Sequence, residues 1–158
     1  MPPRDVGPAT PAVDPAGGAG TAARLEFTLP ARSGAPGLAR ERLRAWLVAR
    51  QCPPEPAEDL VYAANEAVSN ACEHAYRGVE PGLVTVAAEL LGGPDGTVRV
   101  RVVVRDQGRW APPDADRRHH GRGLTIMAAL TSTMGVLRGN GTGTEVTLVG
   151  PPFPAPHA

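Results

Sequence analysis

The spacing of hydrophobic and polar positions predicts a strand and two helices in the first half of the chain. Residues 24–29 alternate between polar and apolar side chains, which is typical of a half-buried strand. Apolar residues then recur at helical spacing, so we expect one helix over residues 36–50 and a second over residues 55–76. Pro53 and Pro54 separate the two helices.

The middle of the chain reads as a hairpin followed by a loop. Residues 83–91 and 98–105 are rich in valine and leucine and predict two strands, which a glycine-rich turn at residues 92–96 joins. Residues 107–120 show no apolar period and predict a long loop. Loops of more than about twelve residues inside a compact domain are often lids or binding loops.

The last third of the chain reads as a helix followed by two strands. A glycine-rich stretch opens a predicted helix that runs from Leu124 to about Thr133. Its apolar stripe consists of Leu124, Met127, Ala128 and Leu130. Residues 135–138 and 144–149 predict two short strands, which a glycine-rich turn separates.

This order of elements predicts an α+β fold with one domain over residues 24–150. Strands that are joined by turns pair antiparallel, so we expect a two-layer α/β sandwich: a mixed, mostly antiparallel sheet with helices on one face. Residues 1–23 consist largely of proline, glycine and alanine, and this composition predicts a disordered tail. Residues 151–158 form a proline-rich tail.

Composition narrows the possible functions. The formal net charge is zero, which gives no indication of binding to nucleic acid or to acidic membranes. All sixteen basic residues are arginine, so the glycine run at residues 92–96 is not a P-loop, which needs a lysine. Cys52 and Cys72 have no paired spacing, and no segment looks like a signal peptide or membrane span, so we expect a cytoplasmic protein.

Polar residues at helical spacing offer the first candidate chemistry. Glu66, Asn70 and His74 are four residues apart and would share one face of a helix. The amide oxygen of Asn70 is a suitable ligand for Mg²⁺, and Glu66 is a carboxylate that can act as a base. Taken alone, such a triplet is more typical of a solvated helix face.

Three further motifs follow in the chain, each at a junction between predicted elements. The four motifs in order are Glu66-x-x-x-Asn70, Asp106-x-Gly108, Gly121-Arg122-Gly123-Leu124 and Gly143-Thr144. Their order, and the long loop between the second and the third, resemble the GHKL ATPase superfamily, whose nucleotide site is the Bergerat fold. The resemblance covers residues 24–149 and is greatest to anti-sigma-factor serine-protein kinases and their actinobacterial relatives. Many members continue the second motif with another glycine, where this chain has Arg109 and Trp110.

The resemblance implies an ATP site with magnesium. Asn70 would hold the Mg²⁺ that bridges the phosphates, and Glu66 would be the general base, although an exposed helix carboxylate is the alternative. Asp106 would accept a hydrogen bond from the adenine amino group, and Gly108 would let the backbone approach the base. An ordinary turn is the alternative for that pair. For His74, a structural role near the helix end is favoured over a phosphate contact.

The third and fourth motifs would complete the nucleotide site. Backbone N–H groups at Gly121 and Gly123, before the helix that Leu124 begins, can bind phosphate oxygens. Arg122 could reach the phosphates, as could Arg117 or Arg118, or all three could be solvated lid residues. Thr144 would lie near the adenine, or it is a strand threonine on a solvated face.

The implied function is an ATP-dependent serine/threonine-protein kinase of the anti-sigma type. Such a protein would phosphorylate a small STAS-type anti-sigma antagonist and sequester a sigma factor, as a homodimer. The alternative is a nucleotide-binding regulatory module that captures protein partners without catalysis. A sensor histidine kinase would need a phosphoacceptor histidine on a helical hairpin before this domain, and the first histidine here is His74. A gyrase-like ATPase would need a transducer domain after it.

Overall fold

The computed structural model describes residues 24–76, 78–108, 117–139 and 143–157, and these build one sheet and a layer of helices. The strands are β1 (Arg24–Pro30), β2 (Leu83–Gly92), β3 (Thr97–Asp106), β4 (Thr133–Arg138), β5 (Thr144–Val149) and β6 (Phe153–Pro154). The helices are α1 (Ala35–Ala49), α2 (Pro54–Asn70) and α3 (Arg117–Leu130), together with the π-helical turn η1 (Ala71–Ala75) and the 3-10 turn η2 (Pro94–Gly96).

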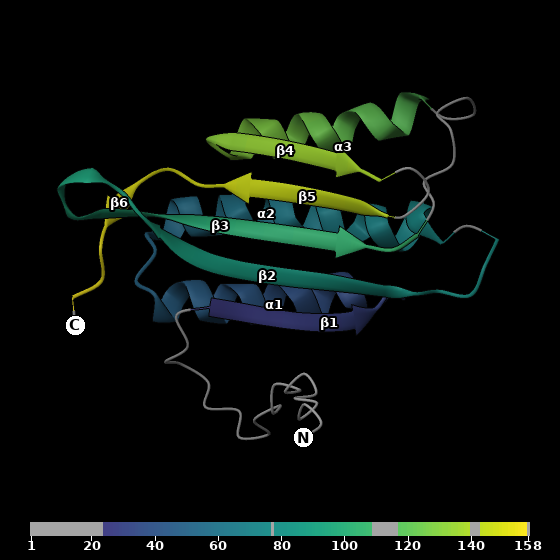
Figure 1. The fold of residues 1–158 in the computed structure, drawn as a ribbon, viewed down its shortest axis with the longest axis horizontal. Helices are drawn as coiled ribbons and strands as arrows, with labels where there is room; N and C mark the ends of the chain where they lie inside the picture. Colours follow the sequence, from purple (N-terminus) through teal and green to yellow (C-terminus); the bar gives the residue numbers. More distant parts are fainter. Residues whose placement is uncertain (1–23, 77, 109–116, 140–142, 158) are drawn as a thin grey trace, which may run out of the picture.

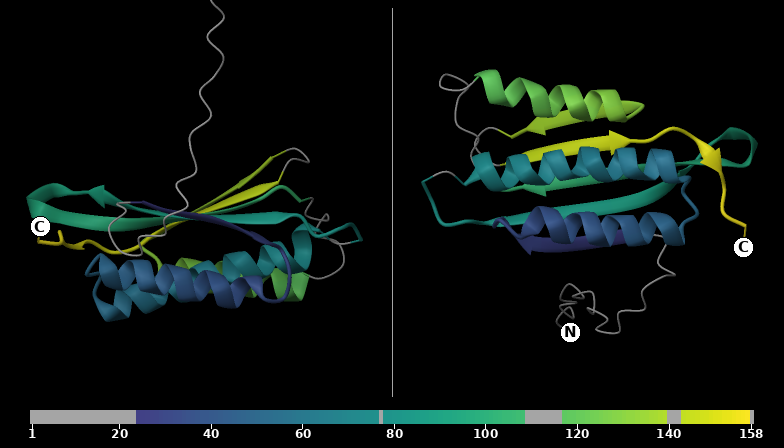
Figure 2. Two further views of the ribbon diagram at one scale, coloured as in Figure 1. Left: turned by 90° about the horizontal axis from the view of Figure 1, so that it is seen from below. Right: turned by 180° about the vertical axis from the view of Figure 1, so that it is seen from behind.

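The described strands pair antiparallel throughout. Their order across the sheet is β1-β2-β3-β5-β4, with β6 paired to the beginning of β3 (Figure 1). All three helices cover the same face of this sheet and leave the other face without helices (Figure 2). The predicted two-layer α+β fold is therefore confirmed, with a sheet that is antiparallel at every described pair.

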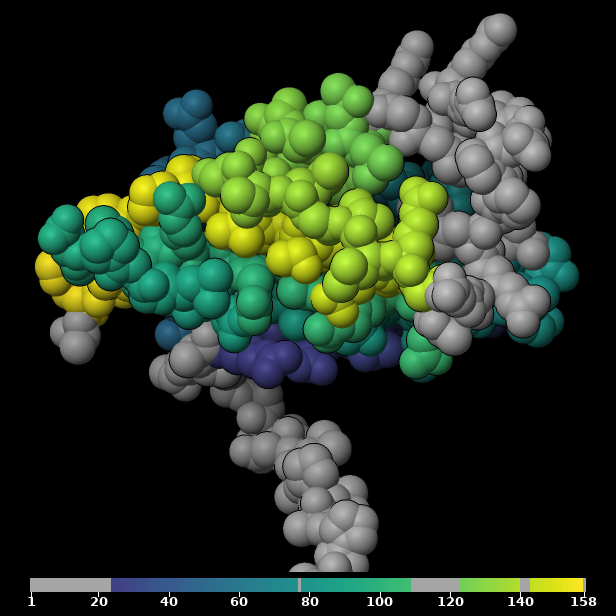
Figure 3. Space-filling model, turned by 45° about the horizontal axis from the view of Figure 1, so that its top comes forward, coloured from purple at the N-terminus to yellow at the C-terminus, as the bar shows by residue number. Residues whose placement is uncertain are grey.

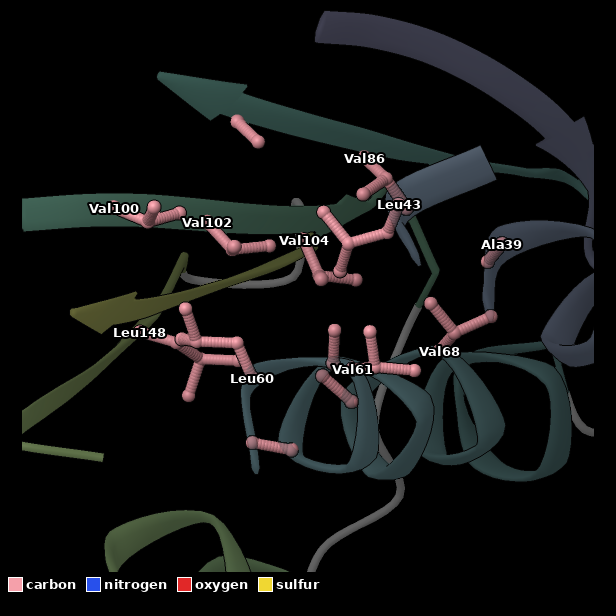
Figure 4. Packing of buried hydrophobic residues seen from close by; sticks show 14 of the residues in the cluster. Ala39, Leu43, Leu60, Val61, Val68, Val86, Val100, Val102, Val104 and Leu148 are labelled. Atoms are coloured by element: carbon pink, nitrogen blue, oxygen red, sulfur yellow. The ribbon is translucent and has the colours of Figure 1, made fainter. Parts of the chain in front are cut away.

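The core lies between the central strands and α2. Alternate residues of β3 point toward the helices, and Val100, Val102 and Val104 are all buried there. Leu60 and Val68 of α2 meet them from the helix layer (Figure 4). Polar residues of α2 lie on both sides of this core: Glu58 and Asn65 accept hydrogen bonds from arginines of α1, whereas Glu66 and Asn70 lie near Gly123 of α3.

The C-terminal segment belongs to the folded body. Phe153 is 5% exposed and pairs with Val98, and Ala155 donates an N–H hydrogen bond to the Gly96 carbonyl. In the space-filling view the C-terminal residues lie beside the β2–β3 hairpin (Figure 3). The proline-rich tail thus supplies an aromatic side chain to the core, which its composition alone did not indicate.

The second predicted helix is not a single α-helix. A continuous helix over residues 55–76 was expected, but α2 ends at Asn70 and a π-helical turn carries the chain to Ala75. A π-turn is wider than an α-turn, so residues after Asn70 do not keep the angular positions that a spacing of four predicts. His74 lies within this π-helical turn and is buried, at 8% exposure.

The third helix begins earlier than its apolar stripe. The sequence predicted a loop over residues 107–120 and a helix over residues 124–133, whereas α3 runs from Arg117 to Leu130 and β4 begins at Thr133. The first turns of a helix need no buried apolar side chain, so an absent period does not exclude helix. Of the predicted stripe, Met127 is buried, but Ala128 is exposed. The rest of the predicted loop, residues 109–116, lies outside the described residues.

No helix among the described segments is long and apolar enough to cross a membrane.

Candidate functional site

The predicted site residues gather at one end of the two-layer body. The carboxyl end of β3, the end of α2 and the beginning of α3 all lie at the same side of the molecule (Figure 1). Two groups of residues meet there, one between α2 and α3 and the other at the strand ends.

The first group is formed by Glu66, Asn70 and Gly123. A Cβ atom built on Gly123 would lie 3.1 Å from the Asn70 Nδ2 atom and 3.5 Å from a Glu66 carboxylate oxygen. The Asn70 amide and the Glu66 carboxylate therefore converge on the α3 backbone at Gly123, a position that has no side chain. Both α2 residues are half-buried, so their polar groups are held by the fold and remain accessible.

The second group is formed by Asp106, Gly108 and Thr144. Asp106 follows Val104 on the helix-facing side of β3 and is 7% exposed. Its Oδ1 atom accepts a hydrogen bond of 3.1 Å from the Gly108 N–H, and Thr144 is its register partner on β5. Thr144 is 5% exposed, so it does not lie on a solvated strand face. A buried carboxylate and a buried hydroxyl thus face the helix layer on neighbouring strands.

Close backbone contacts hold the second group in place. A side chain on Gly108 would overlap with the Ala75 carbonyl group, so the segment after β3 lies directly on the end of η1. Gly143 has a φ angle of +104°, and a side chain there would overlap with the Asp106 carbonyl. Both positions require glycine on steric grounds, and Gly143 requires it on conformational grounds as well.

Tyr76 is a site residue whose contacts the sequence did not indicate. Its hydroxyl donates a hydrogen bond of 2.7 Å to the Leu83 carbonyl and accepts one of 3.0 Å from the Gln107 N–H. The residue follows the first motif in the chain, and its partners lie 7 and 31 positions away. Nothing local in the sequence predicts the second of these contacts.

Cys72 and His74 belong to η1, and the Cys72 thiol donates a hydrogen bond of 3.7 Å to the Arg32 carbonyl, which lies between β1 and α1. The His74 Nε2 atom is 3.6 Å from a carboxylate oxygen of Glu73, and the imidazole is buried. Burial, assisted by the neighbouring Glu73 charge, raises the pKa of the Cys72 thiol, so this cysteine is a protonated packing residue at neutral pH.

The glycines of the third motif lie within a helix rather than before it. They were expected to precede a helix and offer N–H groups to phosphate, but Gly121 and Gly123 lie beyond the first four residues of α3. N–H groups at such positions bond to carbonyls four residues earlier within the helix. Because Gly123 has no side chain, the polar groups of Asn70 and Glu66 can approach the α3 backbone at this position.

Other predicted residues are placed only in part. Leu124 is half-buried and packs against the hydrophobic core. The backbones of Arg117, Arg118 and Arg122 belong to α3, but their side chains lie outside the described residues, as do Arg109 and Trp110 entirely.

A separate hollow of about 580 Å³ lies mainly on the helix-free face of the sheet. Its floor includes the Arg105–Glu145 ion pair, at 2.6 Å, and its wall includes Asp106 and Thr144. It contains neither Glu66 nor the other α2 residues of the first group. The convergence of Glu66 and Asn70 on Gly123 therefore favours a candidate site on the helix side of the sheet.

Comparisons with known proteins show the family and the fold of the chain. The sequence profile of a family described as "Histidine kinase-like ATPase domain" matches residues 29–149. The structure is similar to that of the RsbU and RsbW domains of Rv1364c from Mycobacterium tuberculosis, with 34% sequence identity and a TM-score of 0.62 over 84% of this chain. The match covers 33% of the Rv1364c chain, so this chain spans about a third of its length.

A second solved structure shares the fold alone. The SiaB–SiaC complex from Pseudomonas aeruginosa contains a chain with 19% sequence identity and a TM-score of 0.51. The match covers 79% of this chain and 89% of that one, so the two folds correspond over nearly their whole extent.

Proposed function

The chain belongs to the histidine kinase-like ATPase family, a GHKL family, and on that premise we propose that it is an ATP-dependent protein serine/threonine kinase of the anti-sigma type. The observation that carries the proposal is the convergence of Asn70 and Glu66 on Gly123. The nucleotide would lie between α2 and α3, with its base at the ends of β3 and β5.

The first group of residues fits a magnesium–triphosphate. An amide oxygen is a hard ligand of the kind that Mg²⁺ binds together with phosphate oxygens and water. Asn70 would hold the metal, and Gly123 leaves room beside it where any side chain would press on the amide. When bound, Mg²⁺ neutralises charge on the phosphates.

Glu66 is the proposed general base. It would accept the proton of a serine or threonine hydroxyl while the oxygen of that hydroxyl bonds to the γ-phosphorus. The bond between that phosphorus and the bridging oxygen of ADP breaks, and ADP leaves with the electron pair. In phosphoryl transfer such a carboxylate acts mostly by orienting the nucleophile. Its place one helical turn before Asn70 sets it beside the phosphate end of the site.

Asp106 is proposed to select adenine. A carboxylate accepts a hydrogen bond from the exocyclic amino group of adenine, whereas guanine presents a carbonyl at that position, and two acceptors repel. The Gly108 N–H holds the Asp106 carboxylate through Oδ1, and Thr144 lies beside it in register. The carboxylate is therefore pre-oriented in a buried setting, where an unpaired acceptor is costly.

The proposed partners follow from the anti-sigma type. The phosphoacceptor would be a small STAS-type antagonist, and the captured protein a sigma factor, bound by a homodimer. The likeness to a chain that contains an RsbW domain supports this assignment. The genes adjacent to this one are the first place to look for both partners.

Glu66→Gln separates transfer from binding. We expect the unmodified chain to bind ATP in a magnesium-dependent manner by calorimetry and to transfer radiolabelled phosphate to a STAS-type protein from its own genome. Glu66→Gln should retain ATP affinity within about twofold and lose transfer by about a hundredfold or more, the usual range for a general base.

Two further outcomes decide between kinase and binding module. Asn70→Ala should weaken magnesium-dependent binding, and Asp106→Asn should weaken the preference for ATP over GTP. If the unmodified chain binds ATP but labels none of its candidate partners, the protein is a nucleotide-binding module. If neither substitution changes affinity, the site assignment is wrong.

A further inference from the structure

We propose that Tyr76 is a positioning residue that sets adenine selectivity by fixing the base-reading segment, residues 106–108, against the end of the magnesium-binding helix. This inference rests on the proposed function, because it concerns the same ATP site. Tyr76 has no predicted contact with the nucleotide. It would act on Asp106 through the backbone of Gln107.

The Tyr76 hydroxyl joins three segments that are distant in sequence. Tyr76 follows η1 directly. Its hydroxyl donates a hydrogen bond to the Leu83 carbonyl at the start of β2 and accepts one from the Gln107 N–H just after β3. A phenolic hydroxyl has one proton to donate, and here the acceptor and donor sides are both used. The single side chain therefore connects the helix that carries Asn70 to the residue next to Asp106.

Close packing at two glycines accompanies the hydrogen bonds of Tyr76. A side chain on Gly82 would overlap with the Tyr76 ring, so the ring is seated on the backbone just before β2. A side chain on Gly108 would overlap with the Ala75 carbonyl, so the base-reading segment touches the residue that precedes Tyr76. Ring, hydroxyl and backbone thus fix one relative position of η1 and residues 106–108.

The consequence for selectivity follows from the chain of contacts. Asp106 is held from one side by the Gly108 N–H, and its neighbour Gln107 is held from the other by Tyr76. Without the hydroxyl, the Gln107 N–H and the Leu83 carbonyl both lose a partner, and the segment is free to shift. Discrimination between adenine and guanine depends on the orientation of the Asp106 carboxylate. It is therefore more sensitive to a shift of this segment than phosphate binding is.

The test compares the two tyrosines of the chain, Tyr62 on α2 and Tyr76 directly after η1. Tyr76→Phe removes the hydroxyl described above. Tyr62→Phe makes the same chemical change at an exposed side chain of α2, which lies beside Ile126 and Leu130 of α3 rather than beside residues 106–108. For each full-length protein, the dissociation constants of Mg-ATP and Mg-GTP are measured by calorimetry, and the melting temperature is measured alongside.

We expect Tyr76→Phe to lower the ratio of the GTP to the ATP dissociation constant by about three- to tenfold, the effect of losing hydrogen bonds of ordinary strength. Tyr62→Phe should leave the ratio unchanged. Exchange of the Gln107 amide proton, followed by NMR, should be faster in Tyr76→Phe only. A general loosening of the fold would weaken both nucleotides together and leave the ratio as it was.

Gly82→Ala provides a second route if Tyr76→Phe does not fold. It keeps the hydroxyl but displaces the ring, and it should lower the same ratio. If the unmodified chain prefers ATP and neither variant changes that preference, the inference about Tyr76 is wrong while the proposed function stands. If the unmodified chain binds no ATP, both are wrong.

Discussion

Three glycines at the candidate site lie where atoms of another element approach closely. Gly108 meets the end of η1, Gly143 meets the carbonyl of Asp106, and Gly123 meets the polar side chains of α2. The first two contacts are with backbone, which cannot move aside without shifting a whole segment. The third is with side chains, so its substitution is the more informative test of the site.

Gly123→Ala should separate stability from nucleotide binding. Alanine has a higher helix propensity than glycine by about 1 kcal/mol, so the melting temperature should hold or rise. The added methyl group would lie 3.1 Å from the Asn70 Nδ2 atom and displace that amide. We expect the affinity for Mg-ATP, measured by calorimetry, to fall by about tenfold.

Gly135→Ala is the matched control for that substitution. A side chain on Gly135 in β4 would meet no atom within 4 Å, and its φ angle is not in the left-handed region. Its affinity for Mg-ATP should equal that of the unmodified chain. An unchanged affinity in Gly123→Ala would show that Asn70 does not take part in binding.

At the scale of elements, the site depends on how α2 and α3 meet. Helix α3 reaches the body through Met127, which is fully buried, and through Leu124 and Leu130, which pack against the core in part. The same helix brings Gly123 to the polar face of α2. Packing of α3 against the core therefore also brings the residues of the first group together.

Met127→Ala should lower both stability and nucleotide affinity. Truncating a fully buried methionine costs about 2–5 kcal/mol in the free energy of unfolding, which urea denaturation measures. Affinity for Mg-ATP should fall as α3 loosens. Val48→Ala, at a residue that is 69% exposed on α1, removes a comparable apolar group and should change stability by less than about 0.5 kcal/mol. Equal stability of the two variants would contradict the described packing of α3.

At the scale of the whole molecule, the C-terminal segment adds a short strand to the sheet. Strand β6 pairs with the start of β3, and Phe153 enters the same core as the residues of α1 and α2. The family match ends at residue 149, before this segment. The folded body therefore extends beyond the region that the family defines.

A chain that ends at Gly150 should be less stable than the whole protein. It lacks Phe153, and loss of a buried phenylalanine side chain costs about 3–5 kcal/mol. Thermal unfolding should show a clearly lower melting temperature. A chain that lacks only residues 157–158 keeps Phe153 and should match the full-length protein. If both truncations melt alike, the C-terminal segment does not contribute to the core in solution.

The sequence by itself determined the class of the fold and the family of the chain. Alternation and helical spacing are local signals, and they predicted β1, β2, β3, β5 and the helix over α1. The order of the four motifs identified the GHKL superfamily, which the family match confirms. Short motifs carry this information because each places a particular residue type at the junction of two elements.

Only the tertiary structure decided how the site residues meet. The contact of Gly123 with Asn70, the seat of Tyr76 between Leu83 and Gln107, and the entry of Phe153 into the core all join distant segments. The π-turn that buries His74 and the early start of α3 have no apolar period to reveal them. Local patterns record the face on which a residue lies, whereas packing between elements decides which atoms it touches.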